Sequence, residues 1–125
     1  DRAMENRQIV FIVYVSDVES SVKFYTELLD LKVAFESPRY VAMNLGAGAY
    51  LALWTGKKEE LEKATGRTSE VCLNLAGGEE DILATYDLWR SKGVSIAEEP
   101  HQDVFGTTFI ALDPDGNRIR VAPVD

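Results

Sequence analysis

Hydrophobic and polar residues alternate along this chain with two different periods, which predict its strands and helices. Residues 8–16 are β-branched or aromatic at almost every position, which is typical of a strand covered on both faces. From Val18 to Leu29 the apolar residues then recur at steps of four, three and four, so that they share one side of a helix. Asp17 directly precedes this segment, and we expect it to be the helix N-cap.

The same order of elements is repeated after a charged segment at 56–66, which glycines bound on both sides. We interpret this segment as a solvated connector with about two turns of helix. Beyond it, Ile82, Tyr86 and Trp89 share one side of a second helix, and Gly93 ends that helix. The other segments expected as strands are 31–36, 39–45, 49–54, 70–76, 94–97, 107–112 and 118–122.

These elements form two βαβββ modules, at about 8–55 and 69–123, within one domain of residues 1–125. Sliding the chain by 61 residues places Tyr25 on Tyr86, which supports an internal repeat. We therefore predict an α+β fold in which the two modules form a curved mixed sheet around a cavity. A ligand is expected in that cavity.

Charge and composition exclude several classes of function. Thirteen Lys and Arg against twenty-one Asp and Glu give a net charge of −8, which repels nucleic acids and anionic membranes and attracts cationic ligands. The chain shows neither the apolar core of a signal peptide nor an apolar segment long enough to span a membrane. With a single cysteine it cannot form an intrachain disulfide. We expect a cytoplasmic protein that binds neither nucleic acid nor membrane.

The single cysteine, Cys72, and the single histidine, His101, could in principle form a thiol–imidazole dyad. Cys72, however, lies in a strand that we expect to be buried, whereas His101 lies between Pro100 and Gln102 in an expected loop. We therefore interpret Cys72 as a small core residue and His101 as a solvent-facing side chain, and we predict no catalytic residue.

Short motifs in each predicted module carry a resemblance to a known family. In the first module they are residues 15–17, 24–25 and 28–33, and in the second they are 105–106 and 113–117. In this order and spacing they resemble the vicinal-oxygen-chelate superfamily of glyoxalases, bleomycin-resistance proteins and extradiol dioxygenases. The resemblance covers both modules and implies the same paired βαβββ fold.

The resemblance also implies where a divalent metal would be held. The superfamily's enzymes use His or Glu at four positions, which here are Val10, Ala52, Glu70 and Arg120. Since only Glu70 can bind a cation, we predict no metal and no other cofactor. The chain is closer in charge and length to the metal-free bleomycin-resistance proteins, which are acidic homodimers that bind cationic antibiotics. Because an unpaired buried charge is costly, we expect Glu70 and Arg120 to form an ion pair.

Strand alternation, counted from those four positions, predicts which side chains face the cavity. The resulting lining is aromatic with a few polar groups and suits a stacked planar ligand, with Trp54 and Tyr14 as the stacking residues. The side chains expected to pack against the helices instead are Phe11, Val13, Val15, Leu51 and Leu53. The predicted ligand-binding residues are Ile12, Tyr14, Tyr50, Trp54, Glu70, Asn74, Phe105, Arg118 and Arg120.

Together these residues favour a metal-free homodimer that sequesters a hydrophobic or cationic aromatic compound, such as an antibiotic. One alternative is a metal-dependent lyase, isomerase or dioxygenase of the same superfamily, which its metal content would distinguish. A scaffold or regulatory dimer with a filled cavity is a further alternative.

Overall fold

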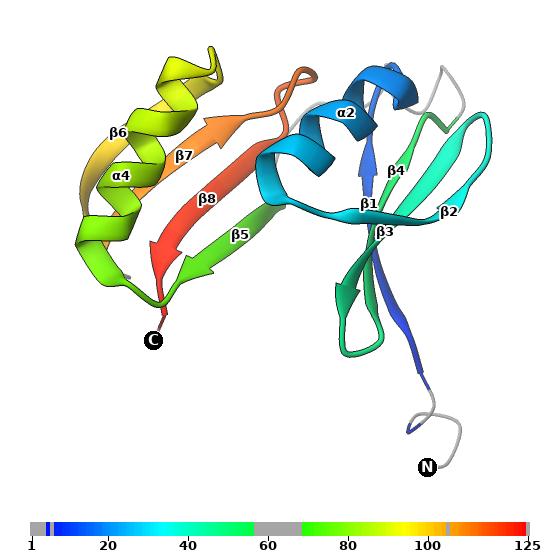
Figure 1. Ribbon diagram of the computed structural model, residues 1–125, viewed down its shortest axis with the longest axis horizontal. Helices are drawn as coiled ribbons and strands as arrows, with labels where there is room; N and C mark the ends of the chain where they lie inside the picture. The colour runs from blue at the N-terminus through cyan, green and yellow to red at the C-terminus, as the bar shows by residue number, and fades with distance from the viewer. Residues whose placement is uncertain (1–4, 6, 57–68, 105, 125) are drawn as a thin grey trace. The chain divides into compact units, whose positions relative to one another are not determined.

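The computed structural model describes residues 5, 7–56, 69–104 and 106–124. The chain forms two compact units, unit 1 at Asp1–Thr65 and unit 2 at Gly66–Asp125 (Figure 1). Within the described residues, each unit contains one four-stranded mixed sheet and one long helix. Neither helix is both long and apolar enough to cross a membrane.

Unit 1 runs in the order strand, helix and three strands. Its elements are β1 (Ile9–Tyr14), α2 (Val18–Leu29), β2 (Lys32–Glu36), β3 (Tyr40–Gly46) and β4 (Ala49–Trp54). The strands lie in the order β1-β4-β3-β2, with β1 and β4 parallel and the other neighbours antiparallel. β1 and β2 are therefore the edge strands of this sheet.

Unit 2 repeats the same order and pairing. Its elements are β5 (Glu70–Leu75), α4 (Gly78–Ser91), β6 (Ser95–Asp103), β7 (Gly106–Leu112) and β8 (Arg118–Pro123). The strands lie in the order β5-β8-β7-β6, again with the first pair parallel. The predicted α+β fold of two βαβββ modules is thereby confirmed.

The two helices begin and end close to the predicted residues, for different local reasons. Asp17 caps α2, and its carboxylate accepts a hydrogen bond from the backbone nitrogen of Ser20 at 3.1 Å. Hydrogen bonds from the side chain and backbone of Ser20 hold the pKa of the Asp17 carboxyl below its usual value. After α4 the chain reverses through Gly93, whose φ of 80° suits glycine.

Large apolar side chains form a core on the helix side of each sheet. In unit 1, α2 contacts β3 and β4. In unit 2, the buried ring of Phe109 lies edge-on to Tyr86 and Trp89 of α4, at centroid distances of 5.3 and 5.6 Å. The side chains of unit 1 that are buried in this core are Val18, Tyr25, Val41, Met43, Leu51 and Leu53.

The motif at 113–117 has a structural role in the turn between β7 and β8. The buried carboxylate of Asp113 accepts hydrogen bonds from the backbone nitrogens of Asp115 and Asn117, at 2.9 and 2.7 Å. Its second oxygen accepts one from the Asn117 side chain at 2.8 Å. Gly116 takes a φ of 83°, which favours glycine.

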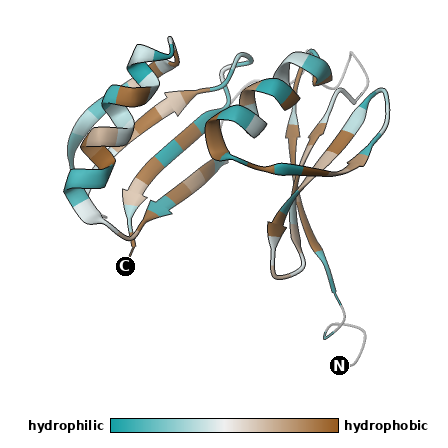
Figure 2. Ribbon diagram, viewed as in Figure 1, coloured by the Kyte–Doolittle hydropathy of each residue, from teal (hydrophilic) through white to brown (hydrophobic). Residues whose placement is uncertain are grey.

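The expectation that the first strand is covered on both faces is wrong. The side chains of Phe11 and Ile12, on opposite faces of β1, are 55 % and 50 % exposed. The reason is the strand order, because β1 lies at the edge of the sheet while α2 contacts β3 and β4. Figure 2 shows that β1 is hydrophobic along nearly its whole length, whereas β8 alternates. Phe11 is consequently not packed against the helix as predicted.

Cys72 and His101 also differ from their predicted environments. Cys72 is exposed, because β5 is an edge strand like β1. His101 lies in a strand and not in a loop, because β6 extends to Asp103 and not only to residue 97. This extension includes Pro100, which an edge strand tolerates where its register with β7 shifts, between Glu98 and His101.

The remaining expectations about local structure concern residues without a described position. Phe105 and the predicted connector at 56–66, apart from Gly56, lie outside the described residues. The cavity and the single-domain organisation expected from the sequence stay predictions.

Candidate ligand-binding faces of the two sheets

One aromatic side chain from each strand of unit 1 contributes to a single row. Tyr14 on β1 and Tyr40 on β3 are both register partners of Trp54 on β4. The ring centroid of Tyr40 lies 6.1 Å from that of Trp54 and 6.0 Å from that of Phe35 on β2. Phe35 is the register partner of Ala42, which lies two residues from Tyr40 on β3 and therefore on the same face. Because register partners project from the same face of a sheet, these four residues share one face, and we call them the aromatic row.

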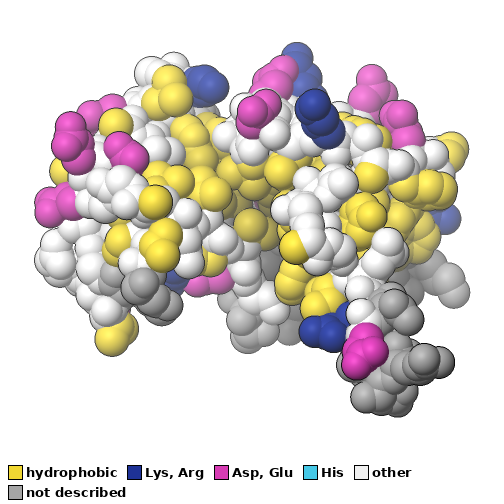
Figure 3. Space-filling view, turned by 60° about the horizontal axis from the view of Figure 1, so that its bottom comes forward, with side chains coloured by type: hydrophobic (Ala, Val, Ile, Leu, Met, Phe, Trp, Pro, Cys, Tyr) yellow, Lys and Arg dark blue, Asp and Glu magenta, His cyan; other side chains and the backbone are white. Residues whose placement is uncertain are grey.

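Beyond the aromatic row, toward the amino ends of β1 and β4, the same face carries smaller and polar side chains. The hydroxyl of Tyr50 accepts a hydrogen bond from the side chain of Gln8 at 3.4 Å. Figure 3 shows hydrophobic side chains at the visible surface of both units. The two further sets of register partners are Ile12, Ala52 and Ala42, and then Val10, Tyr50 and Asn44.

Arg39, just before β3, covers one side of the aromatic row. Its guanidinium carbon lies 5.1 Å from the centroid of the Trp54 ring, in a cation–π contact. Its Nε donates a hydrogen bond to the hydroxyl of Thr55 at 3.1 Å, which fixes the orientation of the guanidinium. Neither Arg39 nor Tyr40 was predicted from the sequence, because strand alternation was applied to β1 and β4 but not to β3, and Arg39 lies just before that strand.

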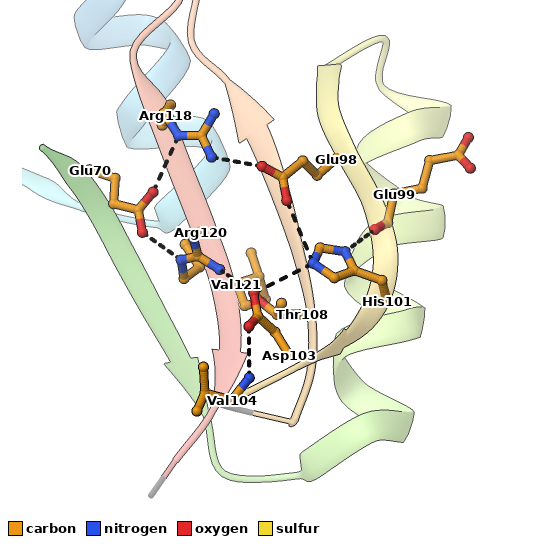
Figure 4. Close-up of polar contacts among 10 residues, drawn as sticks. All are labelled: Glu70, Glu98, Glu99, His101, Asp103, Val104, Thr108, Arg118, Arg120 and Val121. Carbon is orange, nitrogen blue, oxygen red and sulfur yellow. Dashed lines mark hydrogen bonds and ion pairs between the residues drawn. The ribbon is translucent and has the colours of Figure 1, made fainter. Parts of the chain in front are cut away.

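The face of unit 2 that bears Glu70 is charged and not aromatic (Figure 4). Glu70 on β5 accepts hydrogen bonds from the Nε atoms of Arg118 at 3.3 Å and Arg120 at 2.5 Å, both on β8. Arg118 also donates from Nη2 to Glu98 on β6 at 2.9 Å. The predicted ion pair between Glu70 and Arg120 is confirmed, and the structure adds Arg118 and Glu98 to it.

His101 and Asp103 extend this group of charges along β6. The Nε2 atom of His101 lies 3.5 Å from a carboxylate oxygen of Glu98 and 3.6 Å from one of Asp103. Arg120 Nη1 lies 3.9 Å from the same oxygen of Asp103. We refer to these six residues, Glu70, Glu98, His101, Asp103, Arg118 and Arg120, as the charged network.

The pKa values of two members, Glu70 and Arg118, are shifted in the direction that favours their ionised forms. Partial burial alone would raise the pKa of Glu70, but its hydrogen bonds and attraction to Arg120 and Arg118 outweigh this effect and lower it. The hydrogen bond to Glu98 raises the pKa of Arg118. Carboxylate and guanidinium therefore both stay charged at neutral pH and neutralise one another.

The side chains at the four metal positions of the superfamily do not fit a divalent metal. Val10 and Ala52 carry no donor atom, and the Glu70 carboxylate is engaged by two guanidinium groups, one of them from Arg120. Among the residues that the structure describes, no group of three or more His, Cys, Asp or Glu could hold a metal ion. A metal-free protein stays a prediction.

The register explains why the two pairs of positions are equivalent. Val10 pairs directly with Tyr50, and Ala52 lies two residues further along β4. Glu70 pairs directly with Arg118, and Arg120 again lies two residues further along.

The predicted ligand-binding residues that the structure describes all lie on one of these two faces. Ile12, Tyr14, Tyr50 and Trp54 share the aromatic face of unit 1. Glu70, Asn74, Arg118 and Arg120 share the charged face of unit 2, where the amide oxygen of Asn74 contacts the Cys72 sulfur at 3.2 Å. Their role in binding a ligand stays a prediction.

Two βαβββ modules with one sheet each define the class of α+β proteins that the sequence resembles. The chain belongs to the Glyoxalase/Bleomycin resistance protein/Dioxygenase superfamily, whose family model matches residues 7–121.

Two curated relatives differ in the activity that their names state. The phenazine antibiotic resistance protein EhpR of Enterobacter agglomerans is 39 % identical over 117 residues, covering 91 % of this chain and 89 % of the relative. A probable lactoylglutathione lyase of Synechocystis is 31 % identical over 124 residues, covering 88 % of this chain and 89 % of the relative.

Solved structures confirm the fold. The solution structure of protein ATC0852 from Agrobacterium tumefaciens has a TM-score of 0.81 and 27 % identity, covering 96 % of this chain and 98 % of that one. A glyoxalase/bleomycin resistance protein/dioxygenase family enzyme from Burkholderia phytofirmans has a TM-score of 0.77. The match covers 93 % of this chain and 97 % of that one, and at 14 % identity it supports the fold alone.

Proposed function

We propose that this protein sequesters a planar aromatic antibiotic of the phenazine class and does so without a metal ion. The observation that carries the proposal is the aromatic row, which places Tyr14, Trp54, Tyr40 and Phe35 on one face of one sheet. Aromatic side chains offer a flat ligand a broad apolar contact at low entropic cost. The 39 % identity to a phenazine antibiotic resistance protein supports the same ligand class.

The alternative function is a metal-dependent lyase, isomerase or dioxygenase. The similarity to a probable lactoylglutathione lyase favours it. The side chains of Val10, Ala52 and Arg120 at the metal positions disfavour it, because a divalent metal needs neutral or anionic donor atoms.

A calorimetric titration of the protein with phenazine tests the proposal. We expect binding of the unmodified chain, and a loss of affinity of about tenfold or more for Trp54→Ala, since a central aromatic contact is worth at least about 1.4 kcal/mol. Leu88→Ala is the control, because Leu88 is an exposed apolar residue of α4 in unit 2, and it should leave the affinity unchanged.

A chelator separates the two candidate functions. Binding should be the same before and after treatment with EDTA. Unchanged affinity of a folded Trp54→Ala variant would contradict the role of the aromatic row, and loss of binding on chelation would favour the metal-dependent alternative.

We also propose that the protein acts as a cytoplasmic homodimer. The support for a dimer is β1, an edge strand on which Ile9, Val10 and Phe11 are 41–55 % exposed. An exposed apolar edge strand is a surface that another chain commonly covers. Light scattering should give about twice the 13.9 kDa of one chain, and a mass of one chain at micromolar concentration would contradict this part of the proposal.

A further inference from the structure

The aromatic face of unit 1 differs in charge from the chain as a whole. The chain has a net charge of −8. The strand residues that register places on this face nevertheless include no Asp or Glu and one cation, Lys32, the partner of Asn44. Arg39 brings a second positive charge to the aromatic row itself.

Arg39 differs from the arginines of the charged network in how its charge is balanced. Arg118 and Arg120 both donate to the Glu70 carboxylate. Arg39 is oriented by the hydroxyl of Thr55 and the ring of Trp54, and among the described residues no carboxylate forms an ion pair with it. Since Thr55 uses only Nε, the two Nη atoms present further N–H donors beside the aromatic row.

We infer that the aromatic row and Arg39 together select a planar aromatic ligand that carries a carboxylate. The ring of this ligand packs along the aromatic row, and its carboxylate accepts hydrogen bonds from the Nη atoms of Arg39. This inference rests on the proposed function and narrows its ligand class. The sign of the ligand's charge is also the reverse of what the net charge of the sequence alone favours, which is a cationic compound.

The chemistry of the guanidinium explains the selection. Its planar fork of donors matches a carboxylate in a bidentate arrangement, and charge-assisted hydrogen bonds are stronger than those between neutral groups. A neutral carboxamide of the same shape has one acceptor oxygen and no charge, so it would gain the stacking and at most one weaker hydrogen bond. A cationic ligand would be repelled by Arg39 and Lys32, which no acidic strand residue on this face offsets.

Two probes with the same ring system test the inference directly. Calorimetric titration of the full chain at pH 7 would compare phenazine-1-carboxylate with phenazine-1-carboxamide, which has nearly the same shape and no charge. We expect the carboxylate to bind about tenfold more tightly, since a hydrogen bond to a charged group is worth about 1.5 kcal/mol or more.

Substitutions at Arg39 then assign the preference to this residue. Arg39→Gln should remove the preference, so that the carboxylate binds no more tightly than the carboxamide, whereas Arg39→Lys should retain part of the preference. Arg90→Gln is the matched control, because Arg90 makes a similar contact with Tyr86 on α4, at 5.7 Å from the ring centroid. It should keep the full preference.

The outcomes separate this inference from the function on which it rests. Equal affinity of the unmodified chain for the two probes would overturn the inference and leave the proposed function intact. A preference that persists in Arg39→Gln would overturn the assignment to Arg39. If neither probe binds while phenazine does, the inference is wrong, and if phenazine also fails to bind, the proposed function is wrong as well.

Discussion

Unit 1 and unit 2 share one order of elements, one strand order and one pattern of parallel and antiparallel pairs. They also share the side of the sheet that contacts the helix, where large apolar side chains are buried in both. The opposite faces differ completely. In unit 1 that face carries the aromatic row, and in unit 2 it carries the charged network.

The difference is clearest at equivalent register positions. Where β1 and β4 place Val10 beside Tyr50, the parallel strands β5 and β8 place Glu70 beside Arg118. The helix side must stay apolar for either unit to fold, so both units keep large apolar side chains on that side. The other face is free to change, and this freedom lets one fold support different chemistry in its two halves.

The two faces also differ in what they leave available to a ligand. In the charged network, arginines and carboxylates form ion pairs with one another, which makes the face of unit 2 polar but largely balanced in charge. The rings of the aromatic row are apolar surfaces that water satisfies poorly, and Arg39 adds donors beside them. This contrast is why the proposed ligand is assigned to unit 1.

Substitutions in the two cores should have the largest effect on stability and should be alike in both units. We expect Phe109→Ala and Leu53→Ala each to lower the free energy of unfolding by about 3 kcal/mol, because both side chains are fully buried on the helix side. Urea denaturation would measure this. Trp54→Ala should cost clearly less, because the indole lies on the other face and is only partly buried.

The outcome for Trp54 decides whether the comparison holds. If Trp54→Ala destabilised the protein as much as Leu53→Ala, the aromatic row would be core packing, and the contrast between a structural side and a binding side of unit 1 would fail.

Most of the fold could be predicted from the sequence because the two hydrophobic periods are strong in both modules. The helix at 18–29 is an example, since its apolar spacing and Asp17 cap are local signals. Exposure was harder to predict. The apolar pattern of β1 resembles that of a covered strand, and only the strand order, which depends on distant pairing, shows that β1 is an edge.

The charged and aromatic sets could be predicted only in part, for a related reason. The pairing of Glu70 with Arg120 follows from two strands in simple register. Glu98 and His101 join them from β6, whose register with β7 shifts twice. Phe35 likewise reaches the aromatic row across an irregularity between β2 and β3. Alternation within one strand contains no information about such shifts.

The charged network should give a smaller effect than the cores, one that depends on pH and salt. Glu70→Gln should lower the free energy of unfolding at pH 7 by about 1 kcal/mol, since the pairs are partly exposed and screened by water. Glu99→Gln is the control, because Figure 4 shows the Glu99 carboxylate directed away from the network. Its effect on unfolding should be close to zero.

The sign of the pH dependence follows from the lowered pKa of Glu70 in the folded protein. A carboxyl with a lowered pKa stabilises the fold fully above its ordinary value of 4.5, and this contribution is lost as the pH falls through the folded-state pKa. The difference in stability between the unmodified protein and Glu70→Gln should therefore shrink steadily below pH 4.5, and it should also shrink in 1 M salt. Urea denaturation across that range would measure it. A difference that stayed constant with pH, or one that matched Glu99→Gln, would show that the ion pairs of unit 2 contribute no net stability. The stability of unit 2 would then come from its helix side, as we expect for unit 1, and the charged and aromatic faces would differ only in their chemistry.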